Sequence, residues 1–175
     1  MAEIMEKTVA GFAPVADLNA RILILGSMPG ERSLLANEYY AHPQNAFWKI
    51  MNRLIHLDTT LSYAQRTDAL KAARIAVWDV LQSCERSGSL DTAIQRESVV
   101  VNDFDSFFGQ HDQLRFVCFN GRVAEQLFSR HVLATLPPQH VQYARLPSTS
   151  PAHTLAFEKK VAAWGAVLTT ACISK

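Results

Sequence analysis

Residues 21–48, RILILGSMPGERSLLANEYYAHPQNAFW, hold the stretch of sequence that decides the fold. The apolar run Arg21–Leu25 has the length and the branched side chains of a buried strand. It is followed by GSMPG at residues 26–30, the glycine and proline pattern that ends such a strand in a loop. Because ligands of open α/β sheets collect at that end of a strand, this segment predicts a binding site.

Short apolar runs alternate with longer amphipathic stretches along the rest of the chain. The runs are Arg21–Leu25, Arg74–Trp78, Arg115–Phe119 and Val141–Leu146. Helical periodicity occurs at Pro43–Ile55, Leu61–Ala73, Arg122–Leu133 and Ala152–Cys172. The dipeptides His42-Pro43 and Ser150-Pro151 are typical of helix starts. This alternation predicts βα units around a parallel sheet.

The composition fits one domain over residues 1–175, since 49% of the residues are apolar. The net charge of +1 excludes a polycation, but the charge is uneven. From Arg115 onward, seven Lys or Arg residues face two Asp or Glu, so that third carries +5 and the remainder −4. This asymmetry suits an anionic partner along one face, although a solvated helix surface explains it equally well.

The cysteines Cys84, Cys118 and Cys172 are too far apart for a CxxC-type zinc or redox pair. We expect them to be free thiols in a cytoplasmic protein. No apolar run is long enough to span a bilayer, so we expect no membrane partner and no targeting segment. Met1–Ala20 is expected to cap the sheet.

Polar clusters follow each of the four predicted strands. They are GSMPG, Asp79, Asn120 in the sequence FNG, and PSTSPAH at residues 147–153. Parallel strands bring all four clusters to one edge of the sheet. Each cluster has a structural explanation by itself, because Asp, Asn, Ser and Gly are ordinary residues of turns and caps. Their convergence favours a functional site.

The residues at this edge are mostly amides, hydroxyls and aromatics. Metal-ligand spacing, GxSxG, a Walker loop and GxGxxG are all missing from the sequence, so we expect neither a metal nor a cofactor. An aromatic ring can stack on a planar heterocycle, while an Asn side chain offers a donor and an acceptor to its edge. The pattern therefore favours recognition of a base.

Five motifs together resemble the uracil-DNA glycosylase superfamily, in particular its hypoxanthine-DNA (deoxyinosine) glycosylase branch and, more distantly, the mismatch-specific uracil glycosylases. They are GSMPG, YYAHPQNAFWKIM, WDVLQSCERSGSLD, FNG and LPSTSPAH. The resemblance runs from about Arg21 to the last predicted helix and keeps the family's motif order. It implies an α/β fold with a three-layer α/β/α arrangement around a four-stranded parallel sheet.

The resemblance also implies roles for individual residues. The base pocket would be lined by Gly26, Ser27, Met28, Pro29, Gly30 and His42. Met28 stands where the mismatch-uracil branch carries its catalytic amide, so the amide of Asn45 would substitute. Asn120 would act beside it by reading the base edge. Tyr40 would stack on the base; alternatively, it is a core residue beside Tyr39.

Two further assignments leave alternatives open. Asp79 is placed among the substrate-binding residues, with a turn-capping or water-orienting role favoured over that of a general base. The resemblance implies that Pro147, Ser148, Thr149, Ser150 and His153 press into the minor groove of DNA. His153 stands where relatives carry an amide, and it equally fits the first turn of the last helix. Arg122 and Arg145 are candidates for phosphate contacts.

These features predict a monofunctional glycosylase that hydrolyses the N-glycosidic bond of a deaminated base flipped out of DNA, with hypoxanthine favoured. We expect a monomer whose partner is DNA containing deaminated bases. The alternatives are a uracil or broad-range mismatch glycosylase, and a lesion- or nucleotide-binding module without catalysis. An esterase-like hydrolase has no Ser–His pair at motif spacing.

Overall fold

A four-stranded parallel sheet forms the centre of the protein. The computed structural model describes residues 8–137 and 140–173, with side chains up to Thr170. The strand order is β3-β2-β6-β7, with bounds Ile75–Asp79, Ile22–Gly26, Phe116–Asn120 and Gln142–Leu146. All four predicted strands are confirmed, most of them displaced by one residue toward the C-terminus. Every residue of β2 and β3 is buried, as expected for strands covered on both faces.

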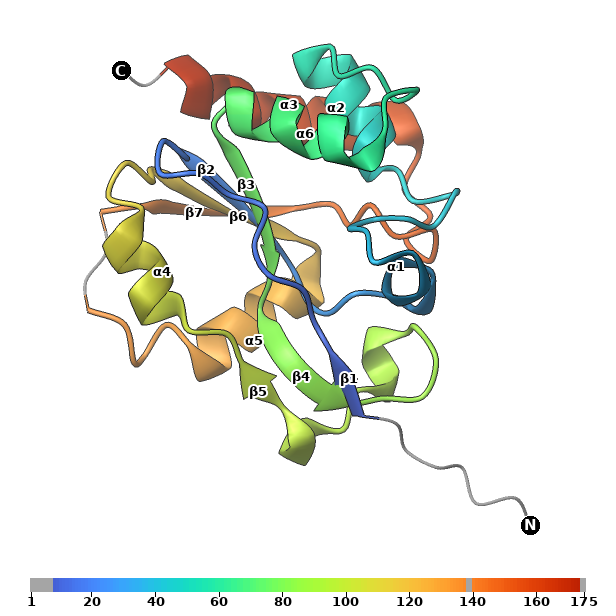
Figure 1. The fold of residues 1–175 in the computed structure, drawn as a ribbon, viewed down its shortest axis with the longest axis vertical. Helices are drawn as coiled ribbons and strands as arrows, with labels where there is room; N and C mark the ends of the chain where they lie inside the picture. The colour runs from blue at the N-terminus through green and yellow to red at the C-terminus, as the bar shows by residue number, and fades with distance from the viewer. Residues whose placement is uncertain (1–7, 138–139, 174–175) are drawn as a thin grey trace.

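Helices cover both faces of this sheet and give the predicted three-layer arrangement. In Figure 1, α2, α3 and α6 lie on one face, and α4 and α5 lie on the other. Their bounds are Phe47–Ile55, Tyr63–Ala72, Phe157–Ile173, Phe104–Gln110 and Arg122–His131. The short helix α1, Glu31–Ala36, follows the loop after β2. The fold class is therefore confirmed, while α1 and α4 were not predicted.

A second, antiparallel sheet was also not predicted. Its order is β1-β4-β5, with bounds Thr8–Ala10, Leu81–Glu85 and Val100–Val101. Only Val80 separates β3 from β4, so the segment after Asp79 continues as a strand. Two 3₁₀ turns, Asp91–Ala93 and Arg96–Ser98, follow β4. Of the segment expected to cap the sheet, residues 1–7 lie outside the described part; Thr8–Ala10 pairs with β4, and Val15 pairs with Val77 of β3.

The predicted helix starts at Pro43 and Pro151 are wrong. Helix α2 begins at Phe47 and α6 at Phe157, and each proline lies in a turn that precedes its helix. Local side-chain bonds explain the difference, because Asn45 Oδ1 accepts from the Phe47 N–H and Ser150 Oγ accepts from the Ala152 N–H. Asn and Ser side chains stabilise such turns in competition with helix.

Cys84 and Cys118 are buried free thiols, as predicted. Burial raises the pKa of the Cys118 thiol to about 12, so it is unreactive at neutral pH. The side chain of Cys172 lies outside the described residues. No helix within the described part of the chain is long and apolar enough to cross a membrane.

Trp164 of α6 connects the helix layer to the loop after β7. Replacing its side chain by a small one is therefore predicted to cause a large loss of stability. Trp164 is fully buried, packs edge-on against Phe47, and donates from Nε1 to the Pro147 carbonyl at 2.9 Å. We expect Trp164→Ala to lower the free energy of unfolding by about 3–5 kcal/mol in urea denaturation. Trp164→Phe, which loses mainly the hydrogen bond, should cost about 1–3 kcal/mol.

Leu133→Ala is the control for Trp164, because Leu133 is an exposed apolar side chain. It should change the free energy of unfolding by no more than about 0.5 kcal/mol. Equal losses for Trp164→Ala and Leu133→Ala would contradict the assigned role of Trp164.

Candidate active site

A cavity of about 400 Å³ lies at the carboxyl ends of the parallel strands. Its walls include most of the residues predicted to form the site. These are Gly26, Ser27, Met28, Pro29, Gly30, Tyr40, His42, Asn45, Asp79, Asn120, Ser148, Thr149 and Ser150. Pro147 and His153 do not line it. The structure thus brings the loops after β2, β6 and β7 and the end of β3 to one place.

The register between β2 and β3 sets Gly26 directly opposite Asp79. A Cβ atom added at Gly26 would collide with Asp79 Oδ1, and the Tyr40 hydroxyl lies 3.5 Å from the same position. The Asp79 carboxyl and the Tyr40 hydroxyl therefore meet near the end of β2. A glycine at position 26 is what leaves room for the acid.

Asp79 is a buried acid in this cavity wall. Its exposed fraction is 4%, and Oδ2 has no hydrogen-bond partner among the described residues. Burial raises the pKa of Asp79 to about 7, and the neighbouring Asp91 adds to this, while Arg86 offsets part of the rise. Near neutral pH the carboxyl is therefore divided between its neutral and charged forms.

The Tyr40 ring lies at the cavity with one face already covered. It stacks on Phe47 at a centroid distance of 4.1 Å. Its buried hydroxyl forms no hydrogen bond of good geometry within the described part of the chain, although the Asn120 side chain lies close enough to lower its pKa. Burial, with a further contribution from Asp79, raises the pKa of this hydroxyl well above its usual value. Tyr39, by contrast, belongs to the core and packs edge-on against Phe12.

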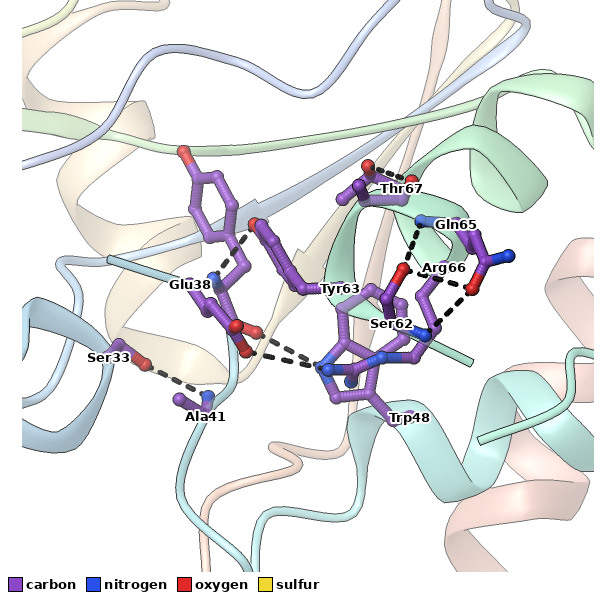
Figure 2. Close-up of polar contacts among 11 residues, drawn as sticks. Ser33, Glu38, Ala41, Trp48, Ser62, Tyr63, Gln65, Arg66 and Thr67 are labelled. Carbon is purple, nitrogen blue, oxygen red and sulfur yellow. Dashed lines mark hydrogen bonds and ion pairs between the residues drawn. The ribbon is translucent and has the colours of Figure 1, made fainter. Parts of the chain in front are cut away.

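Hydrogen bonds to Tyr63 and Ser33, both labelled in Figure 2, hold the backbone on either side of Tyr40. The Tyr39 N–H donates to the Tyr63 hydroxyl at 3.0 Å, and the Ala41 N–H donates to Ser33 Oγ at 3.2 Å. Between these two bonds, Tyr40 has a left-handed φ of 56°, which non-glycine residues seldom adopt. The two bonds thus stabilise an unfavourable backbone conformation.

Arg66 of α3 contacts Trp48 and Glu38. Its guanidinium lies 4.5 Å from the centre of the Trp48 ring and forms an ion pair with Glu38 at 3.5 Å (Figure 2). Ser62 and Gln65 form a capping box at the start of the same helix. None of these residues was predicted to support the site, although the Ser-x-x-Gln pattern at 62–65 is a recognisable helix start.

Asn45 has a fixed amide orientation. Its Oδ1 accepts from the Phe47 N–H at 2.9 Å, so the carbonyl oxygen must point toward the start of α2. The amide nitrogen forms no hydrogen bond with another described residue, and Asn45 is half-buried in the cavity wall. The side chain therefore presents an NH₂ group for a ligand. An Asn that could rotate freely would not distinguish donor from acceptor.

Asn120 is held more tightly than expected for a residue that only reads a base. Its Oδ1 accepts from the Thr149 N–H at 2.8 Å, and its Nδ2 donates to Thr149 Oγ1 at 2.9 Å. Each amide atom keeps one remaining hydrogen-bonding position. Asn120 thus joins β6 to the loop after β7 and retains a limited capacity for ligand binding.

The loop Pro147–His153 is anchored at both ends by α6. Trp164 bonds the Pro147 carbonyl, and the buried Lys160 donates to the His153 carbonyl at 2.8 Å. In its middle, the Thr149 carbonyl accepts from the Ala46 N–H at 2.9 Å. Hydrogen bonds therefore hold this loop, the Pro147–His153 rim of the cavity, in place, and α6 bonds to it at Pro147 and His153.

Two of the residues predicted to face DNA, His153 and Arg145, have other surroundings than expected. His153 precedes α6 by several residues, so its placement in the first helical turn is wrong. It lies instead in a shallow groove beside Lys49 and Lys160. Arg145 already pairs with Glu125 at 3.0 Å, whereas Arg122 begins α5.

The segment after β4 adds residues that the sequence analysis did not assign. Asp91 accepts from the Ser27 hydroxyl at 2.6 Å, and Ser89 Oγ accepts from the Glu31 N–H at 2.9 Å. Arg86 is buried and donates to the Pro29 carbonyl. Burial raises the pKa of Asp91, and its bond from Ser27 offsets part of that rise. The motif WDVLQSCERSGSLD contains all three, but their contacts depend on the unpredicted strand β4.

The raised pKa of Asp79 predicts a pH-dependent effect of Asp79→Asn on stability. The folded protein holds a proton on Asp79 more tightly than the unfolded chain, so this group makes stability fall as the pH rises from about 4 to about 7. The stability of Asp79→Asn relative to the unmodified protein should therefore increase between about pH 5 and about pH 8, by at most about 3 kcal/mol. Urea denaturation at both pH values measures it.

Asp58→Asn provides the control for this experiment. The pKa of this exposed carboxyl is lowered by hydrogen bonds from Thr60, so it stays ionised from about pH 5 to about pH 8. Its effect on stability should be the same at both pH values. An equally constant effect for Asp79→Asn would show that the acid is not perturbed.

Comparison with known proteins supports this arrangement. The sequence model of the Uracil DNA glycosylase superfamily matches residues 13–168. A Hypoxanthine DNA glycosylase of Methanosarcina barkeri is 41% identical over 113 residues, covering 64% of this chain and 70% of that protein. Its counterpart in Methanosarcina acetivorans is 39% identical over 115 residues, covering 65% and 72%.

A solved structure gives the same result for the fold. The solution NMR structure of a "putative Uracil DNA glycosylase" from Methanosarcina acetivorans superimposes with a TM-score of 0.78 and 32% identity. The match covers 94% of this chain and 99% of that one. With the family match spanning nearly the whole chain, this protein belongs to the Uracil DNA glycosylase superfamily.

Proposed function

We propose that this protein is a monofunctional DNA glycosylase that removes hypoxanthine, a deaminated base, after the nucleotide is flipped out of DNA. The observation that carries this proposal is the amide of Asn45: the residue lines the cavity, its oxygen is held by the Phe47 N–H, and its NH₂ group has no partner among the described residues. The two Methanosarcina relatives that carry the name Hypoxanthine DNA glycosylase support the choice of base.

Hydrolysis of the glycosidic bond moves charge in a defined direction. The bonding electron pair leaves with the base, positive charge develops on the sugar, and a water oxygen bonds to the sugar carbon. Groups positioned before the reaction stabilise these charges without reorganising. Asn45 is suited to hold the base or the water, because its NH₂ group donates and its oxygen has a second acceptor position.

The walls of the cavity suggest how the base is selected. Hypoxanthine presents a C=O beside a ring N–H, which requires a donor next to an acceptor. Asn120 retains one donor and one acceptor position. The Asp79 carboxyl adds a group that can donate a hydrogen bond when protonated and only accepts when ionised. In this proposal the Tyr40 ring, which lines the cavity and is backed by Phe47, stacks on the base.

Uracil is the second candidate substrate. It shares the C=O beside a ring N–H, and the structural relative carries the name of a uracil glycosylase. The Pro147–His153 rim is proposed to contact the DNA. Arg122 is proposed as a phosphate contact, because it forms no ion pair with another described residue whereas Arg145 pairs with Glu125. A monomeric state, a cytoplasmic location and a single domain over residues 1–175 stay predictions.

Substitution of Asn45 tests the proposal. Asn45→Asp keeps an oxygen for the Phe47 N–H and removes the free NH₂ group, whereas Asn45→Ala removes both. Single-turnover release of hypoxanthine from duplex DNA should fall by about 10²–10³-fold in both variants. Circular dichroism should show that Asn45→Asp remains folded.

Gln44→Ala is the control, because Gln44 is the exposed neighbour of Asn45 and does not line the main cavity. It should retain the release rate to within about threefold, since a surface substitution removes no group from the transition state. Rates near that of the unmodified protein for Asn45→Asp would refute the catalytic role of the amide.

A further inference from the structure

Arg86 is a buried cation that the mechanism above does not use. It lies just after β4, behind the loop that follows β2, with 2% of its surface exposed. Its Nη2 donates to the Pro29 carbonyl, whereas Nε and Nη1 have no hydrogen-bond partner among the described residues. Burying a guanidinium with unpaired donors is costly, so its presence calls for an explanation.

The charge of Arg86 is not neutralised by an ion pair. None of the salt bridges formed in the described part of the chain involves Arg86. The ionisable groups that respond to its charge are Asp79, Asp91 and Cys84. Burial raises the pKa of all three, which favours their uncharged forms. A buried cation without an ion pair in the described part of the chain therefore lies behind this wall of the cavity.

The contact with Pro29 also orients the next peptide group. The Pro29–Gly30 peptide bond is trans, so the Gly30 N–H points opposite to the Pro29 carbonyl and away from Arg86. Gly30 lines the cavity, and its N–H has no acceptor within residues 8–137 and 140–173. The bonds from Ser27 to Asp91 and from Glu31 to Ser89 brace the loop on either side.

We infer that Arg86 is a positioning residue for the cleavage step: it turns the Pro29 carbonyl away from the cavity, and its charge stabilises the negative charge of the departing base. The inference rests on the proposed function. Arg86 donates no proton in this role and keeps its charge throughout, while the electron pair of the broken bond goes to the base. Negative charge develops on the base only as the bond breaks, so the stabilisation acts on the transition state more than on bound substrate.

The first test separates the cleavage rate from DNA binding. Arg86→Met keeps an unbranched stem and removes the charged guanidinium, whereas Arg86→Lys keeps the charge. For Arg86→Met, we expect single-turnover release of hypoxanthine to fall by about 10- to 100-fold. Affinity for duplex DNA carrying an uncleavable 2′-fluoro deoxyinosine should change by less than about threefold, because the substrate bears no such charge before cleavage.

Arg86→Lys should recover most of the rate lost in Arg86→Met, which a purely structural role would not require. Arg96→Met is the matched control, because Arg96 is exposed and lies outside the cavity. It should leave both the rate and the affinity unchanged. Equal rate losses in Arg86→Met and Arg86→Lys, or a loss that appears only in affinity, would overturn the inference.

A second readout does not depend on turnover. Carbon-13 NMR of the Asp79 carboxyl should show its pKa rising in Arg86→Met, because Arg86 lowers it in the unmodified protein. An unchanged Asp79 titration in folded Arg86→Met would show that the charge of Arg86 does not affect groups in the cavity wall. That result would reject the proposed role of Arg86 and leave the proposed glycosylase function untouched. If the unmodified protein releases no base, the proposed function fails and this role fails with it.

Discussion

The register between β2 and β3 is the constraint on which the site depends. It sets Gly26 opposite Asp79, and only glycine leaves space there for a buried carboxyl group. The GSMPG loop follows β2, one of the two inner strands of the parallel sheet. A buried acid and a backbone loop therefore meet in one cavity because the buried runs of two strands align.

The rest of the cavity is held in place before any ligand binds. Asn120 and Trp164 fix the loop after β7, and the two hydrogen bonds on either side of Tyr40 fix the segment that carries it. Asn45 is oriented by its bond from Phe47. Rigid walls of this kind lower the entropy lost on binding and keep polar groups at the positions where charge develops.

Much of this site could be predicted from the sequence, and the exceptions have physical reasons. Apolar runs such as Arg21–Leu25 identified the parallel strands to within a residue, and parallel strands place their end residues together. The turns at Pro43 and Pro151 resemble helix starts in sequence, because Asn and Ser occur both at helix starts and in turns where their side chains bond to backbone two residues on, as Asn45 and Ser150 do. Arg86 was missed because arginine is normally exposed, and its burial depends on β4, whose partners are distant in sequence.

The most direct test measures base release from DNA by the unmodified protein. Labelled duplexes carrying hypoxanthine, uracil, xanthine or only normal bases are incubated with the protein, and abasic sites are then cleaved with alkali. We expect strand scission at hypoxanthine, with less at uracil and none at normal bases. Tight binding to the hypoxanthine duplex without scission would contradict catalysis and identify a binding module, while preferential scission at uracil would contradict the assigned substrate.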